Sequence, residues 1–442
     1  MQQRKRSMFA VVLAGVLGLA LPALAAPLSD DLFAALRDGD AVPQRYIVSL
    51  KPGVAAADHL AWVRGVHRRS VARRSTAGLE KTFSIGDFHA YAGEFDDETL
   101  RIIQANENVQ AVEPDRIAYI AGAAPPAHQA AGSSSRRAAA ARAATVTQTD
   151  APWGLAMLSS REALASGGTR GHAYTYDASA GEGTWAYVLD SGVLTTNGEL
   201  GGRAVKGYNA WDGVESFDDH FGHGTHVAGT IAAESYGVAK KATIVDVKIV
   251  RSIGYSTVSH VIDGINWVVA NATGTPGRAA KSVINMSLAF PNTAALDSAV
   301  DAASALGILS VVSAGNDGAS ACTRSPASAA SALTVGAVAW DRSRPSWSNF
   351  GPCVDVFAPG VNVASLWATD GVESVNSGTS MASPHVAGLA LYLKALRPDD
   401  TPILLPATPA DTIARILDLA IPGVVTNPGD GSPNLLAYNG IA

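Results

Sequence analysis

Hydrophobic positions along the chain follow two different patterns on either side of a low-complexity stretch. From residue 150 onward, short runs of almost continuous apolar residues alternate with longer stretches that have helical apolar spacing. Continuous apolar runs are typical of parallel strands that are buried on both faces of a sheet. The alternation therefore predicts an α/β fold, with a mostly parallel sheet covered by helices on both faces. We expect strands over 185–189, 242–250, 282–288, 308–314 and 332–339, and helices over 222–233, 258–270 and 296–306.

Residues 45–119 show a separate pattern of strands and helices in the order βαββαβ, which fits a small ferredoxin-like α+β domain. Asp97 is expected to cap the second helix of this domain, because its side chain can accept from free backbone N–H groups. Pro114 is expected to end the last strand, because proline has no N–H to donate. Strands are expected over 45–50, 82–85, 88–95 and 109–112, and helices over 55–71 and 97–106.

The stretch from Met381 to Leu396 is apolar or small almost all the way round, which predicts a helix buried inside a sizeable domain. Pro384 is tolerated if it lies near the first turn, where backbone N–H groups have no intrahelical partner. Ser380 would then lie at the helix N-terminus, where free N–H groups favour negative charge. A serine held there can be a nucleophile whose own N–H binds an oxyanion. Taken alone, Ser380 is better explained as a helix N-cap, and only the rest of the chain favours the nucleophile.

Three further reactive side chains fall at the carboxyl ends of predicted strands or at the start of a predicted helix. Asp190 follows the first strand of the sheet, His223 opens a helix, and Asn316 ends a later strand. In open α/β sheets, chemistry gathers at this edge. With Ser380, these residues supply a nucleophile, a general base, a carboxylate to orient the base and an amide donor for an oxyanion.

Each of these residues also has an ordinary explanation when taken alone. Asp190 is then a turn residue and Asn316 a loop asparagine. His223 and His226 are three residues apart and could bind a metal, but no His-Glu-x-x-His pattern or third ligand accompanies them. It is the joint occurrence in the order Asp, His, Ser that favours a catalytic site.

The composition provides a large core and argues against nucleic acid as the main partner. Hydrophobic residues make up 47% of the 442 residues and charged residues 16%, and the formal net charge is −6. Residues 1–145 carry 17 basic and 14 acidic residues, whereas 146–442 carry 16 basic and 25 acidic residues. A basic front segment is expected to attract, and to cover, an acidic remainder.

The N-terminus predicts a secretory signal peptide over residues 1–25. It has a basic segment at Arg4-Lys5-Arg6, an apolar core from Met8 to Leu21 and a small-residue cleavage site at Ala23-Leu24-Ala25. The apolar run is short for a membrane span, so we expect a secreted, extracellular protein without a membrane partner. An uncleaved anchor is the alternative.

Cys322 and Cys353 are the two cysteines of the chain, so one intramolecular disulfide is possible. Two unpaired buried thiols are the alternative, but export favours the disulfide. Residues 121–145 are rich in Ala, Ser, Gly and Pro without periodicity, which is typical of a linker. Within them, Arg136-Arg137 is either a processing site or solvated charge.

The sequences around Asp190, His223 and Ser380 resemble the subtilisin-like serine proteases of the proteinase K branch, from about residue 148 to residue 439. Residues 45–120 resemble the inhibitory propeptide of that family. The resemblance implies a zymogen in which the propeptide is an intramolecular inhibitor, followed by the linker and a subtilisin-like peptidase domain over 146–442. It also supports a disulfide between the two cysteines, as in aqualysin-type members.

The resemblance further implies an endopeptidase with a broad preference for apolar or aromatic residues at P1. The positions that match the substrate cleft form a strand, a pocket wall and an outer subsite: Ser287, Leu288 and Ala289; Ala314 and Gly315; Gly254 and Tyr255. Ala289 replaces a glycine of the relatives and is followed by Phe290, so we expect a narrower pocket or a tilted strand.

A calcium site is also implied by the resemblance, with Asp355 and the backbone carbonyls of Ala330 and Ala332 as ligands. Such hard oxygen ligands suit Ca²⁺. A second calcium site of the family is expected to be lost, because Arg161 occupies the position of a threonine ligand.

The sequence therefore predicts a secreted serine endopeptidase that acts on protein or peptide substrates as a monomer. A serine esterase of the α/β-hydrolase type is a weaker hypothesis, because Gly378-Thr379-Ser380 lacks the second glycine of a nucleophile elbow and the order Asp, His, Ser is wrong for it. A catalytically silent binding protein is weaker still, because all four catalytic residue types are present.

Overall fold

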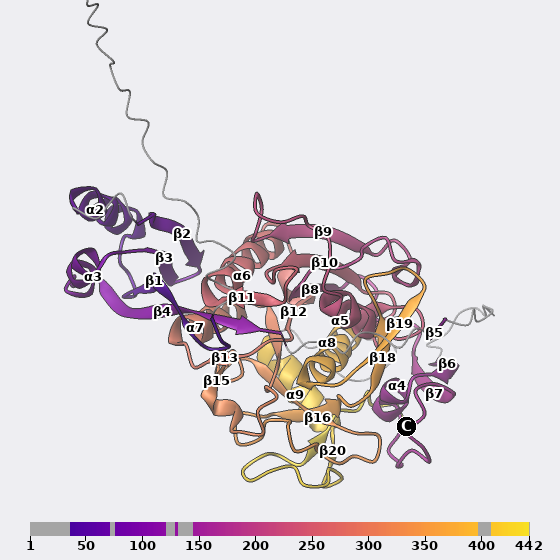
Figure 1. Cartoon of the computed structure of the whole chain (residues 1–442). Coiled ribbons are helices and arrows are strands. Elements are labelled where there is room, and N and C mark those ends of the chain that lie inside the picture. Colours follow the sequence, from indigo (N-terminus) through magenta and orange to yellow (C-terminus); the bar gives the residue numbers. More distant parts are fainter. Residues whose placement is uncertain (1–35, 71–75, 121–128, 131–144, 397–407, 442) are drawn as a thin grey trace, which may run out of the picture.

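The computed structural model describes residues 36–70, 76–120, 129–130, 145–396 and 408–441 (Figure 1). The predicted signal peptide and most of the predicted linker lie outside these residues. In the described part of the chain, no helix is long and apolar enough to span a bilayer.

The C-terminal domain (residues 145–441) is built around one sheet with helices on both faces (Figure 1). In the described residues the strand order is β20-β21-β17-β16-β14-β12-β8-β10-β9, and all neighbours except β20 and β21 are parallel. This confirms the predicted α/β fold. The strands are β8 (Trp185–Asp190), β9 (Ala204–Asn209), β10 (Thr243–Lys248), β12 (Ser282–Met286), β14 (Leu309–Ser313), β16 (Leu333–Val338), β17 (Val356–Pro359), β20 (Ile421–Pro422) and β21 (Leu435–Leu436).

Helices α5 and α8 contact each other and one face of the sheet, whereas α6 and α7 cover the other face. The residues of β8, β12, β14 and β16 are almost all buried, as expected of strands between two helical layers. The helices are α4 (Trp153–Leu158), α5 (His223–Ala232), α6 (Val258–Thr273), α7 (Ala294–Ala305), α8 (Thr379–Ala395) and α9 (Pro409–Leu419).

Helix α8 runs through the centre of the domain and is buried on all sides, as its sequence predicts. It begins at Thr379, so Pro384 lies inside the helix rather than near its free first turn. The missing N–H of Pro384 leaves the carbonyl of Ser380 without its helical donor. The hydroxyl of Ser287 donates to that carbonyl at 2.9 Å and replaces the lost bond. The proline is therefore tolerated through a contact that the sequence pattern did not reveal.

The N-terminal domain (residues 36–120) has an antiparallel sheet with two helices, in the predicted order βαββαβ. Two details of the prediction are wrong. Asp96, not Asp97, caps the second helix by accepting from the N–H groups of Glu98 and Thr99. The last strand continues through Pro114, where the register with the neighbouring strand is irregular, so the missing N–H is tolerated. The elements are β1 (Ala41–Leu50), α2 (Ala56–Arg69), β2 (Gly78–Ile85), β3 (Phe88–Glu94), α3 (Asp97–Gln104) and β4 (Val109–Tyr119).

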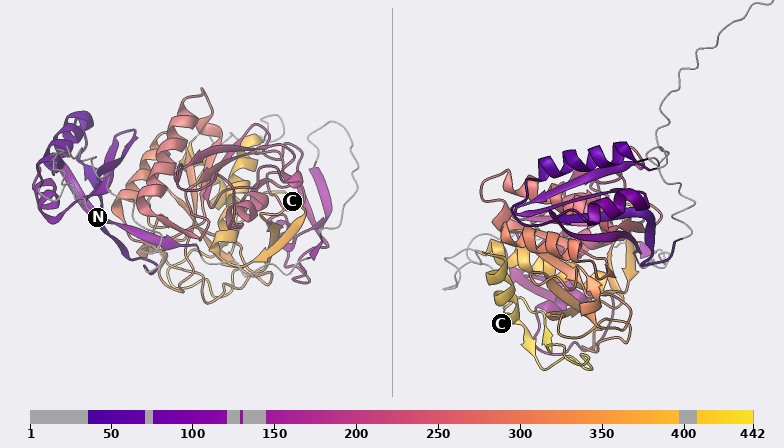
Figure 2. Two further views of the ribbon diagram at one scale, coloured as in Figure 1. Left: turned by 45° about the horizontal axis from the view of Figure 1, so that its top comes forward. Right: turned by 90° about the vertical axis from the view of Figure 1, so that its left-hand side faces the viewer.

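Strand β4 belongs to both domains. Within the N-terminal domain it pairs with β1, and on its other side it pairs antiparallel with β11 (Tyr255–Thr257) of the C-terminal domain. The N-terminal domain also packs on α6 and α7, and Figure 2 shows its indigo elements lying against these helices. The two domains therefore share one continuous sheet at their boundary.

The remaining strands of the C-terminal domain form small sheets of two or three strands. Cys322 and Cys353 form a disulfide across 31 residues, which confirms the predicted pairing. The small sheets contain β13 (Phe290–Pro291) with β15 (Arg324–Ser325), β18 (Val363–Leu366) with β19 (Val372–Asn376) and β5 (Gln129–Ala130), and β6 (Thr145–Ala151) with β7 (His172–Asp177).

Candidate active site

The structure brings Asp190 and His223 into direct contact. Asp190 is the last residue of β8 and His223 is the first residue of α5, and both are almost completely buried. Nδ1 of His223 lies 2.8 Å from Oδ1 and 3.0 Å from Oδ2 of Asp190. A carboxylate can only accept, so Nδ1 carries the proton and Nε2 is left as the basic nitrogen.

A second carboxylate, Asp219, fixes this pair and was missed by the sequence analysis. Its Oδ1 accepts from the hydroxyl of Ser191 at 2.9 Å and from the N–H of Gly222 at 2.7 Å. Its Oδ2 accepts from the hydroxyl of Thr225 at 2.6 Å. Asp219 thus ties the turn after Asp190 to the start of the helix that carries His223. Its only signal in the sequence is an acidic residue four positions before the histidine.

Ser380 lies in the first turn of α8, as the sequence predicts, and its side chain is buried. Its hydroxyl donates to the backbone carbonyl of Ser287 at 3.2 Å, and no hydrogen bond to His223 is formed among the described residues. A serine hydroxyl swings between staggered rotamers at little cost. Catalytic hydrogen bonds commonly shorten only when substrate is bound.

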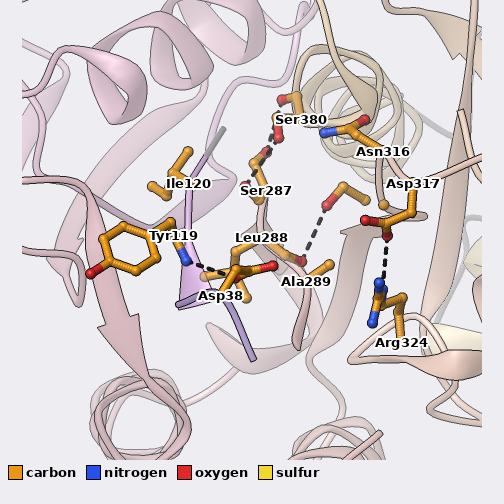
Figure 3. Close-up of a pocket in the computed structure, with 12 residues that line it drawn as sticks. Asp38, Tyr119, Ile120, Ser287, Leu288, Ala289, Asn316, Asp317, Arg324 and Ser380 are labelled. Atoms are coloured by element: carbon orange, nitrogen blue, oxygen red, sulfur yellow. Dashed lines mark hydrogen bonds and ion pairs between the residues drawn. The ribbon is translucent and has the colours of Figure 1, made fainter. Parts of the chain in front are cut away.

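Asn316 is oriented by Thr379, the residue before Ser380. The Oδ1 atom of Asn316 accepts from both the backbone N–H and the hydroxyl of Thr379, each at 2.9 Å. The amide nitrogen is therefore turned away from Thr379, and Figure 3 shows it directed towards the side of Ser380. This geometry places two donors, the side-chain amide of Asn316 and the backbone N–H of Ser380, at the start of one helix, where an oxyanion is stabilised.

Ser380 and Asn316 open onto a cavity of about 280 Å³ (Figure 3). Of the predicted cleft residues, Ser287, Leu288, Ala289 and Gly315 line it, whereas Ala314 does not. Ala314 is buried, and its carbonyl accepts from the side chain of Asn349 at 2.9 Å. The cavity is lined by Asp38, Tyr119, Ile120, Ser287, Leu288, Ala289, Ser313, Gly315, Asn316, Asp317, Arg324 and Ser380.

Phe290 does not narrow this cavity as expected. Its side chain is fully buried and is absent from the cavity wall, because the chain turns into β13 at this residue. Of Ala289 and Phe290, therefore, only Ala289 lines the cavity.

Comparison with known proteins agrees with this geometry. The profile of the subtilase family matches residues 181–434, and the profile of peptidase inhibitor I9 matches residues 45–121. The chain belongs to the subtilase family. It is 45% identical over 430 residues to an alkaline proteinase of Hapsidospora chrysogena, covering 97% of this chain and 98% of that protein. It is 43% identical over 453 residues to alkaline protease 1 of Aspergillus flavus, covering the full length of both.

A solved structure supports the same assignment. The crystal structure of a cold-adapted subtilisin-like serine proteinase matches with a TM-score of 0.58 and 40% identity, covering 66% of this chain and 98% of that chain. The protein is thus a subtilase of the serine endopeptidase class, and its N-terminal domain is a propeptide of the I9 inhibitor type, called the prodomain below.

Residues of the prodomain line the same cavity as Ser380. Gly254 and Tyr255 do not line the cavity but flank it, where Tyr255 pairs with Tyr119 of β4 and the carbonyl of Gly254 accepts from the N–H of Ile120 at 2.8 Å. Tyr119 and Ile120 contribute to the same cavity wall as Ser380. Asp38, from the segment before β1, completes that side by accepting from the N–H of Tyr119 at 3.0 Å.

Two carboxylates of β4 also cap helices of the catalytic domain. Asp115 accepts from the N–H of Ser259 at 3.0 Å and from its hydroxyl at 2.6 Å, at the start of α6. Glu113 accepts from the N–H groups of Ala294 and Ala295, at 2.8 and 2.9 Å, at the start of α7. Negative charge at a helix N-terminus is stabilising, so both contacts strengthen prodomain binding.

We expect the double substitution Glu113→Gln with Asp115→Asn to weaken inhibition by the prodomain. The amides still accept, but the charge that complements the two helix dipoles is lost, so the inhibition constant should rise by about tenfold or more. The measurement is inhibition of the mature enzyme by added prodomain. Asp58→Asn, an exposed change on α2, is the matched control. Equal inhibition by the double variant and the control would contradict this role.

His226 does not form a metal pair with His223. Its ring is buried, and Nε2 lies 3.1 Å from the carbonyl of Val363 and 3.2 Å from that of Ser374. Burial lowers the pKa of His226 to about 3, so the ring is neutral and Nε2 donates to these carbonyls. His226 therefore joins α5 to β18 and β19.

The residues implied for calcium lie at one end of β16 and β17. The carboxylate of Asp355 accepts from the N–H of Thr334 at 2.7 Å, and burial raises its pKa to about 6. Within the described residues, no group of three His, Cys, Asp or Glu side chains could hold a metal. A cation here would therefore take one side-chain ligand, Asp355, and complete its shell with carbonyls such as those of Ala330 and Ala332. This donor set is oxygen only, which fits Ca²⁺.

Proposed function

We propose that this subtilase is a secreted serine endopeptidase, made as a zymogen, that cleaves proteins with a broad preference for apolar or aromatic P1 residues. The observation that carries the proposal is the buried contact between His223 and Asp190, together with a cavity that Ser380 and Asn316 both line. The predicted signal peptide and the disulfide support secretion, because disulfides persist outside the cytoplasm.

The geometry assigns one role to each of the four residues. Ser380 attacks the scissile carbonyl while Nε2 of His223 takes its proton, and His223 then gives this proton to the leaving amine. Asp190 holds the imidazole in the required tautomer and stabilises its cation. Asn316 and the backbone N–H of Ser380 donate to the oxyanion. Leu288 and Ala289 supply apolar surface for the P1 side chain.

Replacing Asn316 by leucine should lower kcat by about 10²–10³, a magnitude taken from the matching loss in subtilisin. KM should change little, because the amide donates mainly to the charge that develops in the transition state. Steady-state kinetics on a peptide anilide measures both constants. A raised KM at unchanged kcat would mean that Asn316 only binds substrate.

We also propose that Asp355 and the carbonyls of Ala330 and Ala332 hold a structural Ca²⁺. The ion would neutralise a partly buried carboxylate and tie the end of β17 to the segment before β16. Chelation should lower the melting temperature of the mature enzyme by several degrees, since a ligand that binds only the folded state stabilises it. Restored stability on adding Ca²⁺, and a loss of this response in Asp355→Asn, are the expected results. Identical melting with and without chelator would refute the site.

The overall proposal is tested with the purified mature enzyme. It should hydrolyse casein and lose this activity when a sulfonyl fluoride modifies Ser380, as shown by peptide mapping. A serine esterase would be labelled but would leave casein intact. A silent binding protein would show neither labelling nor hydrolysis.

A further inference from the structure

One wall of the cavity beside Ser380 carries two charged side chains, Arg324 and Asp317, which the sequence analysis did not identify as cavity residues. Nε of Arg324 donates to Oδ2 of Asp317 at 2.8 Å, and both side chains line the cavity. The side chain of Arg324 is 26% exposed, whereas Asp317 is an exposed residue with a side chain that is 42% exposed. Figure 3 shows Ser380 and Asn316 on one side of the cavity and Arg324 on the other, with the strand that carries Leu288 and Ala289 between them. The cavity therefore offers both apolar atoms and an ion pair to a side chain that enters it.

The ion pair is held in place by the fold. Arg324 lies in β15, which pairs with β13 opposite Pro291, and it follows the disulfide-bonded Cys322 by two residues. The N–H of Asp317 donates to the side chain of Asn349 at 3.0 Å. Both charged residues thus project from short segments that are anchored on each side, so the charged wall is a fixed part of the cavity.

The guanidinium of Arg324 has N–H groups that donate to no described residue. A guanidinium carries five N–H groups, and in the described residues only Nε has a hydrogen-bond partner. The two terminal nitrogens can therefore donate to an oxygen of a bound side chain. Such charge-assisted, fork-shaped contacts are the strongest that arginine makes.

A carboxylate already enters this cavity in the precursor. Asp38 of the prodomain lines the cavity wall, where burial raises the pKa of its carboxyl, while Arg324 attracts its charge and Asp317 repels it. Asp38 departs with the prodomain, so that a side chain of the substrate can take its place in the cavity.

We propose that Arg324 is a specificity residue that lets the cavity accept glutamate and glutamine at P1, in addition to apolar and aromatic residues. The inference rests on the proposed function, because it takes the cavity beside Ser380 as the P1 site. Asp317 moderates the effect, since it neutralises Arg324 and repels an acidic side chain. The aspartate side chain is one carbon shorter, so it should gain much less than glutamate.

The test compares kcat/KM for peptide anilides that differ only at P1, with Phe, Glu, Gln, Asp or Lys. In Arg324→Leu the ratio of Glu to Phe should fall by about tenfold or more, the size of a lost charge-assisted hydrogen bond. In Asp317→Asn the same ratio should rise severalfold, and that of Lys to Phe should fall. Lys281→Gln removes an exposed positive charge that does not line the cavity, and should leave all ratios unchanged.

Titration of the active serine by the sulfonyl fluoride gives the folded fraction of each variant, and Arg324→Lys replaces the leucine variant if that one does not fold. With lysine the ratio should fall less than with leucine, because the charge stays but the fork is lost. An equal Glu-to-Phe ratio in wild type, Arg324→Leu or Lys, and Asp317→Asn would overturn the specificity role and leave the protease assignment standing. A wild-type enzyme that hydrolyses none of the anilides would overturn the proposed function itself, and the inference with it.

Discussion

Ser380→Ala is expected to lower casein hydrolysis by about 10⁶, a magnitude taken from the same loss in subtilisin. The hydroxyl belongs to the first turn of α8, and Ser380 lines the same cavity as Asn316, whose amide would hold the scissile carbonyl together with the backbone N–H of Ser380. Without it, His223 has no proton to take, so the remaining residues contribute little on their own. The oxyanion donors are unaffected, so a small residual rate above that in water should persist.

The same substitution should also stop maturation of the precursor. Ile120 of the prodomain lines the cavity beside Ser380, so we expect Ser380 itself to make the first cut in the precursor. We expect a mature start near Val146, and a first cut near Gly122 with later trimming is the alternative. N-terminal sequencing of wild type reads these sites, and Ser380→Ala should keep the prodomain covalently attached. Ser216→Ala, at an exposed position, is the matched control. Retained hydrolysis or processing in Ser380→Ala would end the assignment.

Asp190→Asn is expected to lower kcat by about 10⁴, as the matching change does in serine proteases of this type. In the native protein Nδ1 of His223 donates to the carboxylate at 2.8 Å, which leaves Nε2 free to accept the proton of Ser380. Asparagine presents either an N–H or an uncharged oxygen. It therefore favours the wrong tautomer in one orientation, and in the other it fails to stabilise the imidazolium.

The effect of Asp190→Asn on catalysis can be separated from any effect on folding. Asp190 also accepts from the N–H of Ser191 at 2.7 Å, a bond that the asparagine oxygen can keep. The melting temperature of Asp190→Asn should therefore stay close to that of wild type while kcat collapses. Asp218→Asn, an exposed change close to His223 in sequence, serves as control. Equal kcat in the two variants would exclude the orienting role of Asp190.

Much of the fold followed from the sequence because its signals are local. A continuous apolar run such as that of β14 indicates a buried parallel strand. A polar residue at the carboxyl end of such a strand, such as Asp190 of β8, indicates the edge of the sheet where the active site lies. The start of α8 was placed two residues late. The bond that offsets Pro384 comes from Ser287, far away in the chain, so no local pattern could show it.

The missed residues share a physical cause. Asp218 and Asp219 are adjacent acids in one polar run, yet the first is exposed and the second is buried among the N–H groups before α5. Arg324 and Asp317 likewise read as ordinary loop charges, because the cavity that they line is assembled from distant strands. Burial of a charge is a property of the folded chain, and spacing along the sequence does not encode it.

The contacts of β4 bear on how the inhibited precursor becomes active. A cut beyond Ile120 breaks none of the hydrogen bonds that β4 makes to β1 or to β11, and none of those that Glu113 and Asp115 accept from α6 and α7. We therefore expect the cleaved fragment to stay bound in the cavity, so that cleavage alone releases no activity. The first enzyme molecules that lose the fragment can cleave the fragments still bound to other molecules. The onset of proteolysis is therefore expected to be sigmoidal and self-accelerating.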